Sequence, residues 1–163
     1  MRRLGLTLAA TAIVALSACS KAPTTAPAGP AAPAAPAAPM SAADRQAALA
    51  KLPAPYNTAD LANGEAKFAL CSACHTLAAG GPSMTGPNLH GVFGRKAASL
   101  AGFTYSEALK ATGWTWDAAR IDSWIADPKV AVPGTKMTFA GLKDPKDRTD
   151  VIAYVMIGTG FQP

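Results

Sequence analysis

Apolar side chains recur at helical spacing in the second half of the chain. Trp124 and Ile125 lie three and four positions after Ile121, as expected for one face of an α-helix. No stretch alternates apolar and polar residues as a half-buried strand does. The pattern therefore predicts an all-α domain. This domain would contain four short helices. The first is capped by Thr58 and runs into Cys71, and the others extend from Thr104 to Gly113, from Thr115 to Asp127 and from Asp144 to Gly158.

The predicted helices begin at recognisable capping residues. Thr58 and Thr115 are expected N-caps, and Thr104 with Glu107 forms a T-x-x-E capping box. Pro145 occupies the tolerated first position of the last helix. A further short helix is predicted between Ser41 and Pro53.

A long irregular segment separates the first two of these four helices. Residues 78–103 contain glycines at 80, 81, 86, 91, 94 and 102 and prolines at 82 and 87. A loop of this length is unusual in a small domain. Because four short helices bury little apolar surface by themselves, the pattern predicts a large cofactor at the centre.

The first 18 residues have the features of an export signal. Arg2 and Arg3 precede an apolar run, 4–18, that is shorter than the roughly 20 residues of a membrane span. Its end, Leu16-Ser17-Ala18-Cys19, resembles the lipobox of bacterial lipoproteins, which predicts lipidation of Cys19 and a lipid anchor on the periplasmic side of a bacterial membrane. Ordinary cleavage and an uncleaved anchor are the alternatives.

A linker follows the signal. Residues 22–39 contain only Ala, Pro, Thr and Gly, with a proline at nearly every third position. Such a composition cannot build a core and favours an extended chain. The predicted organisation is an export signal at 1–18, a lipid anchor and linker with a short helix at 19–55, and a folded domain at 56–163.

The charge argues against nucleic acid as a partner. The 163 residues carry a formal net charge of +5, and removing Arg2 and Arg3 with the signal leaves 13 basic and 10 acidic residues, or +3. These charges are dispersed, whereas nucleic-acid-binding domains cluster a higher positive charge on one face.

The segment Cys71-Ser72-Ala73-Cys74-His75 carries the predicted chemistry. C-x-x-C-H is the signature of covalent c-type haem attachment, with His75 as an iron ligand. Two alternatives fit the motif less well. A zinc site would need four ligands, and the only other thiol is the distant Cys19. A thioredoxin-like redox pair would need a β-α-β pattern, which the sequence does not show. A structural disulfide leaves His75 and the small core unexplained. The motif predicts one haem c.

The sixth iron ligand separates an electron carrier from a protein that binds small molecules at iron. The candidates are Met137, His90, Met84 and Met156. Met137 is favoured, because it lies in a turn-rich segment, 132–139, that can reach the far side of the haem. Met156 fits a core position in the last helix, and His90 and Met84 follow His75 closely in the chain.

Several further motifs resemble mitochondrial cytochrome c and its class I bacterial relatives, including membrane-anchored ones. The resemblance covers about residues 57–160, and its motifs are GPNLHGVFGR at 86–95, GFTY at 102–105, PGTKM at 133–137 and DRTDVIAY at 147–154. It implies a class I cytochrome c fold of about four short helices and long Gly/Pro-rich loops around one covalently bound haem.

The resemblance also implies roles for individual residues. Pro87 would hold the His75 ring, and Gly64 and Phe68 would contact Val151 and Tyr154. Arg95, Tyr105, Trp116 and Thr135 would lie at the haem propionates, and Phe139 would shield the methionine side. Lys96, Lys129, Lys136 and Lys143 would be candidates for partner docking. Trp124 and Leu109 replace a tyrosine and an asparagine that relatives place near the iron.

The resemblance implies an electron-transfer protein, and no enzyme. It would carry single electrons in a bacterial respiratory chain, between a quinol:cytochrome c reductase and a haem-copper terminal oxidase, as a monomer. The alternative is a haem-based peroxidase or gas-binding sensor with a displaceable Met137.

Overall fold

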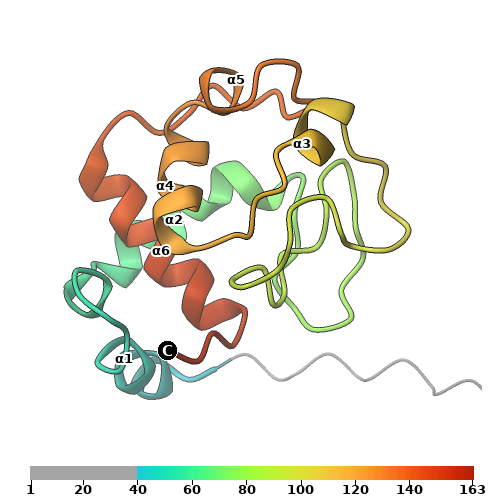
Figure 1. Ribbon diagram of the computed structural model, residues 1–163. Coiled ribbons are helices and arrows are strands. Elements are labelled where there is room, and N and C mark those ends of the chain that lie inside the picture. The colour runs from blue at the N-terminus through green and yellow to red at the C-terminus, as the bar shows by residue number, and fades with distance from the viewer. Residues whose placement is uncertain (1–39) are drawn as a thin grey trace, which may run out of the picture. The chain divides into compact units, whose positions relative to one another are not determined.

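The computed structural model describes residues 40–163, so the predicted export signal, Cys19 and the Pro-rich linker lie outside the described part. Within it, the helices are α1 (Ala42–Leu49), the 3-10 turn η1 (Tyr56–Thr58), α2 (Leu61–Ser72), α3 (Glu107–Ala111), α4 (Ala118–Ala126), α5 (Pro128–Ala131) and α6 (Pro145–Gly158) (Figure 1). Residues 40–163 form no strand, only an isolated antiparallel bridge between Lys96 and Thr115. The predicted all-α class is confirmed.

The starts of α2, α3 and α4 lie later than the sequence predicts. Thr58 belongs to η1, and the N-cap of α2 is Asp60, whose carboxylate accepts the N–H groups of Ala62 and Asn63 at 3.0 Å. A carboxylate satisfies two free backbone donors and also interacts favourably with the positive end of the helix. Asp60 is therefore a better cap than the threonine two positions earlier.

The expected capping box at α3 does not form. The N-cap is Ser106, whose Oγ accepts the N–H of Leu109 at 3.2 Å, while Glu107 pairs with Lys110 at 2.8 Å. At α4 the cap is Asp117 and not Thr115. In each case a better acceptor two residues further along replaces the predicted cap.

The other boundaries agree with the sequence, with one addition. Helix α6 begins with Asp144 as N-cap and Pro145 in the first turn, as predicted, and α1 confirms the short helix expected after residue 41. The unpredicted element is α5. Asp127 ends α4 and at the same time caps α5, with Pro128 in its first turn.

Helices α2 and α6 cross at Gly64. A side-chain carbon at Gly64 would collide with the backbone carbonyl of Asp150 and lie 3.0 Å from Cβ of Tyr154. The ring of Phe68 lies 5.5 Å from that of Tyr154, between centroids. The predicted close approach of these helices is confirmed, and it requires glycine at position 64.

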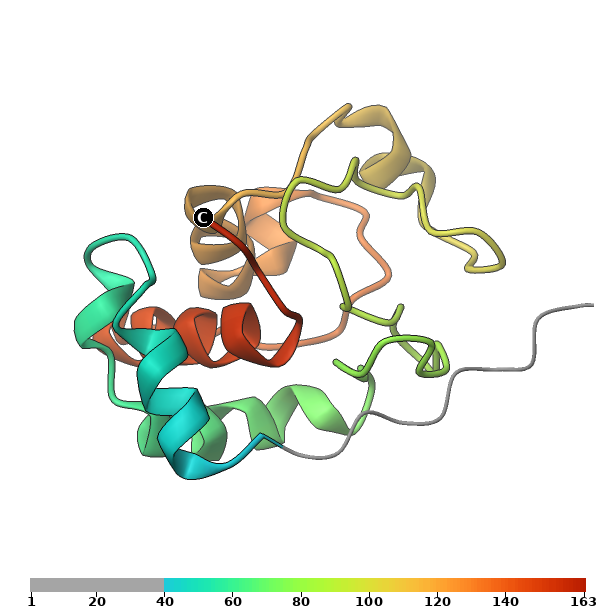
Figure 2. The same cartoon turned by 90° about the horizontal axis from the view of Figure 1, so that it is seen from below.

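Helix α6 is the central element of the described unit. It packs against α1, η1, α2 and α4, and Figure 2 shows it running between α2 and α4. Val151 and Val155 belong to one apolar cluster with Phe68 and Trp124, whereas Ile152 and Met156 belong to a second with Leu49 and Leu52. The segment before the predicted domain start at residue 56 thus packs onto α6 through Ile152 and Met156, on a face adjacent to the one that contacts Phe68 and Trp124.

Candidate functional site

The last turn of α2 places Cys71, Cys74 and His75 together. The Cys71 carbonyl accepts the N–H groups of both Cys74 and His75 at 3.0 Å, which closes a tight turn at the helix end. Both cysteines are half-buried free thiols. Burial, with a smaller effect from Cys74, raises the pKa of Cys71 to about 11, so its sulfur is protonated at neutral pH.

The His75 ring is fixed in one orientation. Its Nδ1 lies 2.7 Å from the Pro87 carbonyl, which only accepts hydrogen bonds, so Nδ1 carries the proton and Nε2 has a free lone pair. Burial lowers the pKa of His75, although the bond to Pro87 opposes this effect, and the neutral ring is favoured. The hydrogen bond expected from the resemblance is present.

Gly86 is a contact of His75 that the sequence analysis missed. A side-chain carbon at Gly86 would lie 2.6 Å from the Nδ1 and Nε2 atoms of the ring. Backbone bonds hold this segment in place, since the Gly86 N–H donates to the Cys74 carbonyl at 2.9 Å. The indication of this contact in the sequence is that Gly86 directly precedes Pro87, whose carbonyl binds the His75 ring.

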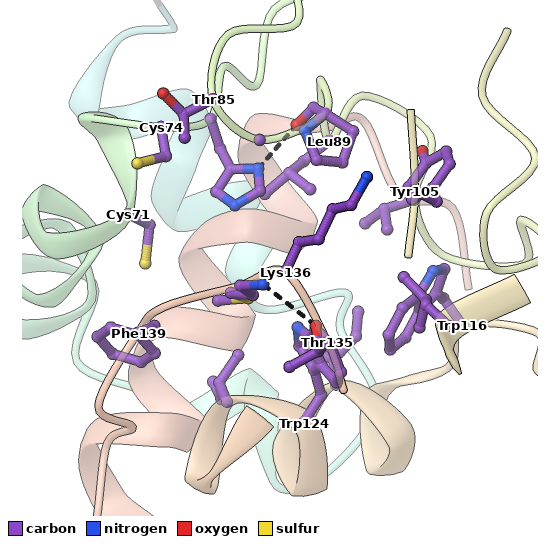
Figure 3. Close-up of a pocket in the computed structure, with 18 of the residues that line it drawn as sticks. Cys71, Cys74, Thr85, Leu89, Tyr105, Trp116, Trp124, Thr135, Lys136 and Phe139 are labelled. Atoms are coloured by element: carbon purple, nitrogen blue, oxygen red, sulfur yellow. Dashed lines mark hydrogen bonds between the residues drawn. The ribbon is translucent and has the colours of Figure 1, made fainter. Parts of the chain in front are cut away.

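These residues open onto a cavity of about 360 Å³. Figure 3 shows Cys71 and Cys74 at one end of the cavity and Tyr105 and Trp116 at the other. The walls between them are mainly apolar and include Phe68, Leu89, Val92, Leu109, Trp124 and Val155. Trp124 and Leu109, the two replacements noted in the sequence, are therefore both buried wall residues.

Polar side chains gather at the Tyr105 end of the cavity. Arg95 lines the cavity and donates to the carbonyls of Asn88 at 3.0 Å and His90 at 3.1 Å. Tyr105, Trp116 and Thr135 line it as well, and burial raises the pKa of Tyr105, which keeps its hydroxyl protonated. This end can donate hydrogen bonds to acidic groups.

Met137 is the only one of the four candidate sixth ligands that lines the cavity. It is half-buried in the loop between α5 and α6, and its N–H donates to Thr135 Oγ1 at 3.2 Å. Met156 is 1 % exposed in the cluster with Leu49, and Met84 is 42 % exposed. His90 is exposed too. Phe139, expected beside Met137, also lines the cavity.

The four candidate docking lysines lie in different surroundings. Lys96 and Lys136 are exposed at the cavity, and Lys129 is exposed on α5. Lys143 pairs with Asp127 at 2.9 Å and also donates to the Ala126 carbonyl. Its charge is therefore largely balanced within the molecule.

The Cytochrome c family model matches residues 61–157, which contain all the cavity residues named above. The chain belongs to the cytochrome c family. It is an electron-transfer protein and no enzyme, and it carries one covalent haem c with its iron.

Individual relatives agree with this assignment. Cytochrome c of Kluyveromyces lactis is 42% identical over 64% of this chain and 96% of its own length. Cytochrome c2 of Rhodomicrobium vannielii is 45% identical over 67% of this chain and 87% of its own. The solved structure of cytochrome cH from Methylobacterium extorquens is 49% identical, with a TM-score of 0.55, and the match covers 59% of this chain and 96% of that one.

The cavity residues fit this cofactor. Two free thiols three positions apart lie at one end, and a ring nitrogen with a free lone pair lies beside them. The walls are mainly apolar, and hydrogen-bond donors lie at the opposite end. The acidic propionates of such a group would need donors of this kind. Residues 40–163 contain no helix with the length and apolar character of a membrane span.

Proposed function

We propose that His75 and Met137 bind the haem iron from its two sides and that the protein is a low-spin one-electron carrier. The observation that supports this most strongly is that both side chains line one cavity, whereas His90, Met84 and Met156 do not. Two ligands from the protein would leave no position at the iron open to a substrate. The bound haem supplies the Fe(III)/Fe(II) couple.

The surrounding residues hold the group and tune it. Cys71 and Cys74 would provide the thioether bonds, and the Pro87 carbonyl orients the His75 ring. Arg95, Tyr105, Trp116 and Thr135 would hydrogen-bond to the propionates or offset their charge. The apolar walls would exclude water, which favours the less charged reduced state, and Phe139 would shield the side of the group that Met137 faces.

We also propose that the protein works outside the cytoplasm, on the periplasmic side of a bacterial membrane, anchored by a lipid on Cys19. Electrons would arrive from a quinol:cytochrome c reductase and leave to a haem-copper terminal oxidase. The support is the export-type sequence of residues 1–19 and the family resemblance. A linker to the membrane raises the effective concentration of the carrier near such complexes, so that weak docking suffices.

Absorption spectra of the purified holoprotein test the ligand proposal. We expect a weak far-red band from sulfur bound to Fe(III), and no change in the spectrum of the reduced protein when carbon monoxide is added. A missing far-red band together with rapid carbon monoxide binding would contradict His75/Met137 ligation. That result would instead support the peroxidase or gas sensor.

Cys19→Ser tests the lipid anchor. We expect the wild-type protein in the membrane fraction and the variant in the soluble periplasmic fraction, because two or more acyl chains hold a protein stably and none remains in the variant. Ser20→Ala is the matched control and should stay in the membrane. Membrane association that is unchanged in Cys19→Ser would exclude this anchor.

A further inference from the structure

Residues 141–143, called the return segment, lead the chain from Met137 back to α6 and are fastened to the end of α4. The Leu142 N–H donates to a carbonyl in the last turn of α4 at 2.8 Å. A side-chain carbon at Gly141 would collide with the Ala126 carbonyl, so the two backbones are in close contact there. Leu142 is 8 % exposed and lines the cavity. The return segment thus joins the cavity wall to α4.

Arg148 of α6 binds the same segment. Its Nη1 donates to the carbonyls of Leu142 at 3.0 Å and Lys143 at 2.9 Å. Its Nε donates to the Asp122 carboxylate of α4 at 2.8 Å, and the Arg148 side chain is only 13 % exposed. Bonds with a charged donor are about twice as strong as neutral ones. Because a guanidinium holds its donors in one rigid plane, this side chain fixes α4, α6 and the return segment relative to one another.

The loop between Met137 and the return segment has few bonds of its own. Residues 138–140 make no hydrogen bond with another residue in the described part of the chain. Before them, the Met137 N–H donates to Thr135 Oγ1 at 3.2 Å. The hydrogen bonds that hold Met137 in place are therefore those of Thr135 on one side and of the return segment on the other. A segment with few backbone bonds opens at a lower free energy than a packed helix.

We propose that Arg148 and its partner Asp122 are positioning residues for Met137, which fix the return segment and so determine how rarely the Met137 sulfur leaves the haem iron. This rests on the proposed His75/Met137 ligation. Without the Asp122 carboxylate, the guanidinium loses its link to α4 and is free to move together with the return segment. The loop can then leave the cavity more often, and the iron is open to small molecules for a larger fraction of the time.

Imidazole binding to the ferric holoprotein tests the proposal. The sulfur–iron bond must break before a bond between iron and the imidazole nitrogen forms, the iron stays Fe(III), and no proton moves. The rate is followed by stopped-flow absorption as the far-red band disappears. At high imidazole concentration it should reach a limit, because the opening of the Met137 loop then controls it.

Asp122→Asn should raise this limiting rate roughly threefold to tenfold, because it removes the charge of a partly buried pair and keeps the shape of the side chain. Arg148→Lys keeps the positive charge but lacks the planar group that binds two carbonyls and a carboxylate together. It should raise the limiting rate by roughly tenfold. Both variants should retain the far-red band before imidazole is added, since Met137 still binds the iron for most of the time.

Asp147→Asn is the matched control. It removes the charge of another α6 ion pair, whose partners Lys67 and Asn63 lie on α2, away from the return segment. Its limiting rate should stay within about twofold of wild type, although the loss of an ion pair lowers the free energy of unfolding in both carboxylate variants. Chemical denaturation measures that loss for each of them.

Two results would overturn the proposal alone. One is a limiting rate that is unchanged in both Asp122→Asn and Arg148→Lys, and the other is an equal acceleration in Asp122→Asn and Asp147→Asn, which would make general destabilisation the cause. A wild-type rate that rises with imidazole concentration without a limit would contradict His75/Met137 ligation itself. The two proposals therefore fail in distinguishable ways.

Discussion

Replacing Met137 with alanine should remove the sixth ligand of the haem iron and leave that position open to small molecules. The far-red band should disappear, carbon monoxide should bind the reduced protein readily, and the reduction potential should fall. Thioether ligation favours Fe(II), and axial ligands span roughly 0.8 V in haem proteins, so a fall on the order of 0.1 V or more is expected. Absorption spectroscopy and potentiometric titration of the purified variant measure these changes.

Met84→Ala is the matched control for this experiment. Met84 is exposed and does not line the cavity, so its removal should leave the spectrum and the potential unchanged. A far-red band that persists in Met137→Ala would show that another sulfur binds the iron. The loss of the band in Met84→Ala would contradict the placement of the loop that carries it.

Asp150→Ala should lower the free energy of unfolding by about 3 kcal/mol, since removing a buried charged acceptor leaves its donors unsatisfied. Asp150 is 2 % exposed and joins α6 to the start of α2. Its carboxylate accepts the Asp60 N–H at 3.0 Å, the Asn63 side-chain amide at 2.7 Å and the Lys146 ammonium at 2.6 Å. Chemical denaturation of the holoprotein measures the loss.

Asp147→Ala is the control for this variant, because it removes a nearby carboxylate of the same helix. It should lower the free energy of unfolding by about 1 kcal/mol or less, since Asp147 is only partly buried.

The pH dependence of stability gives a second test of the role of Asp150. Burial alone would raise the pKa of Asp150, but the hydrogen bonds from Lys146, Asn63 and Asp60 outweigh it and hold the pKa below its ordinary value. Its stabilising contribution is therefore complete above the unfolded pKa and is lost as the pH falls through the folded value. Asp150→Ala should be less sensitive to acid than wild type, and equal acid sensitivity would contradict this account.

The sequence predicted the helices well where local signals agree with packing. Helix α6 has an N-cap, a proline in its first turn and apolar positions at helical spacing, and all three indicate the same element. The starts of α2, α3 and α4 were each placed two residues early, because Thr58, Thr104 and Thr115 are each followed two positions later by a competing acceptor. Asp and Ser are better N-cap residues than Thr, and the structure uses the later residue at all three starts.

The site was predictable where chemistry fixes the spacing of residues. C-x-x-C-H places two thiols and an imidazole at one helix end whatever the rest of the chain does. The turn-rich segment 132–139 already favoured Met137 in the sequence, and the position of Met137 in the cavity wall and of Met156 in a core supports this proposal. The contact of Gly86 was harder to predict, because it depends on how closely the loop before Pro87 approaches the His75 ring.

The two apolar clusters on α6 also determine how the domain would carry a mechanical load. The cluster on the α1 side contains Leu49 and Leu52 and is contacted by Phe161, so both ends of the described chain are tied to the same helix. A pull on the residues before α1 would therefore be resisted first by Leu49 and Leu52. Because Ile152 of the same cluster also lines the cavity, strain at this end of the domain would reach the cavity wall through α6.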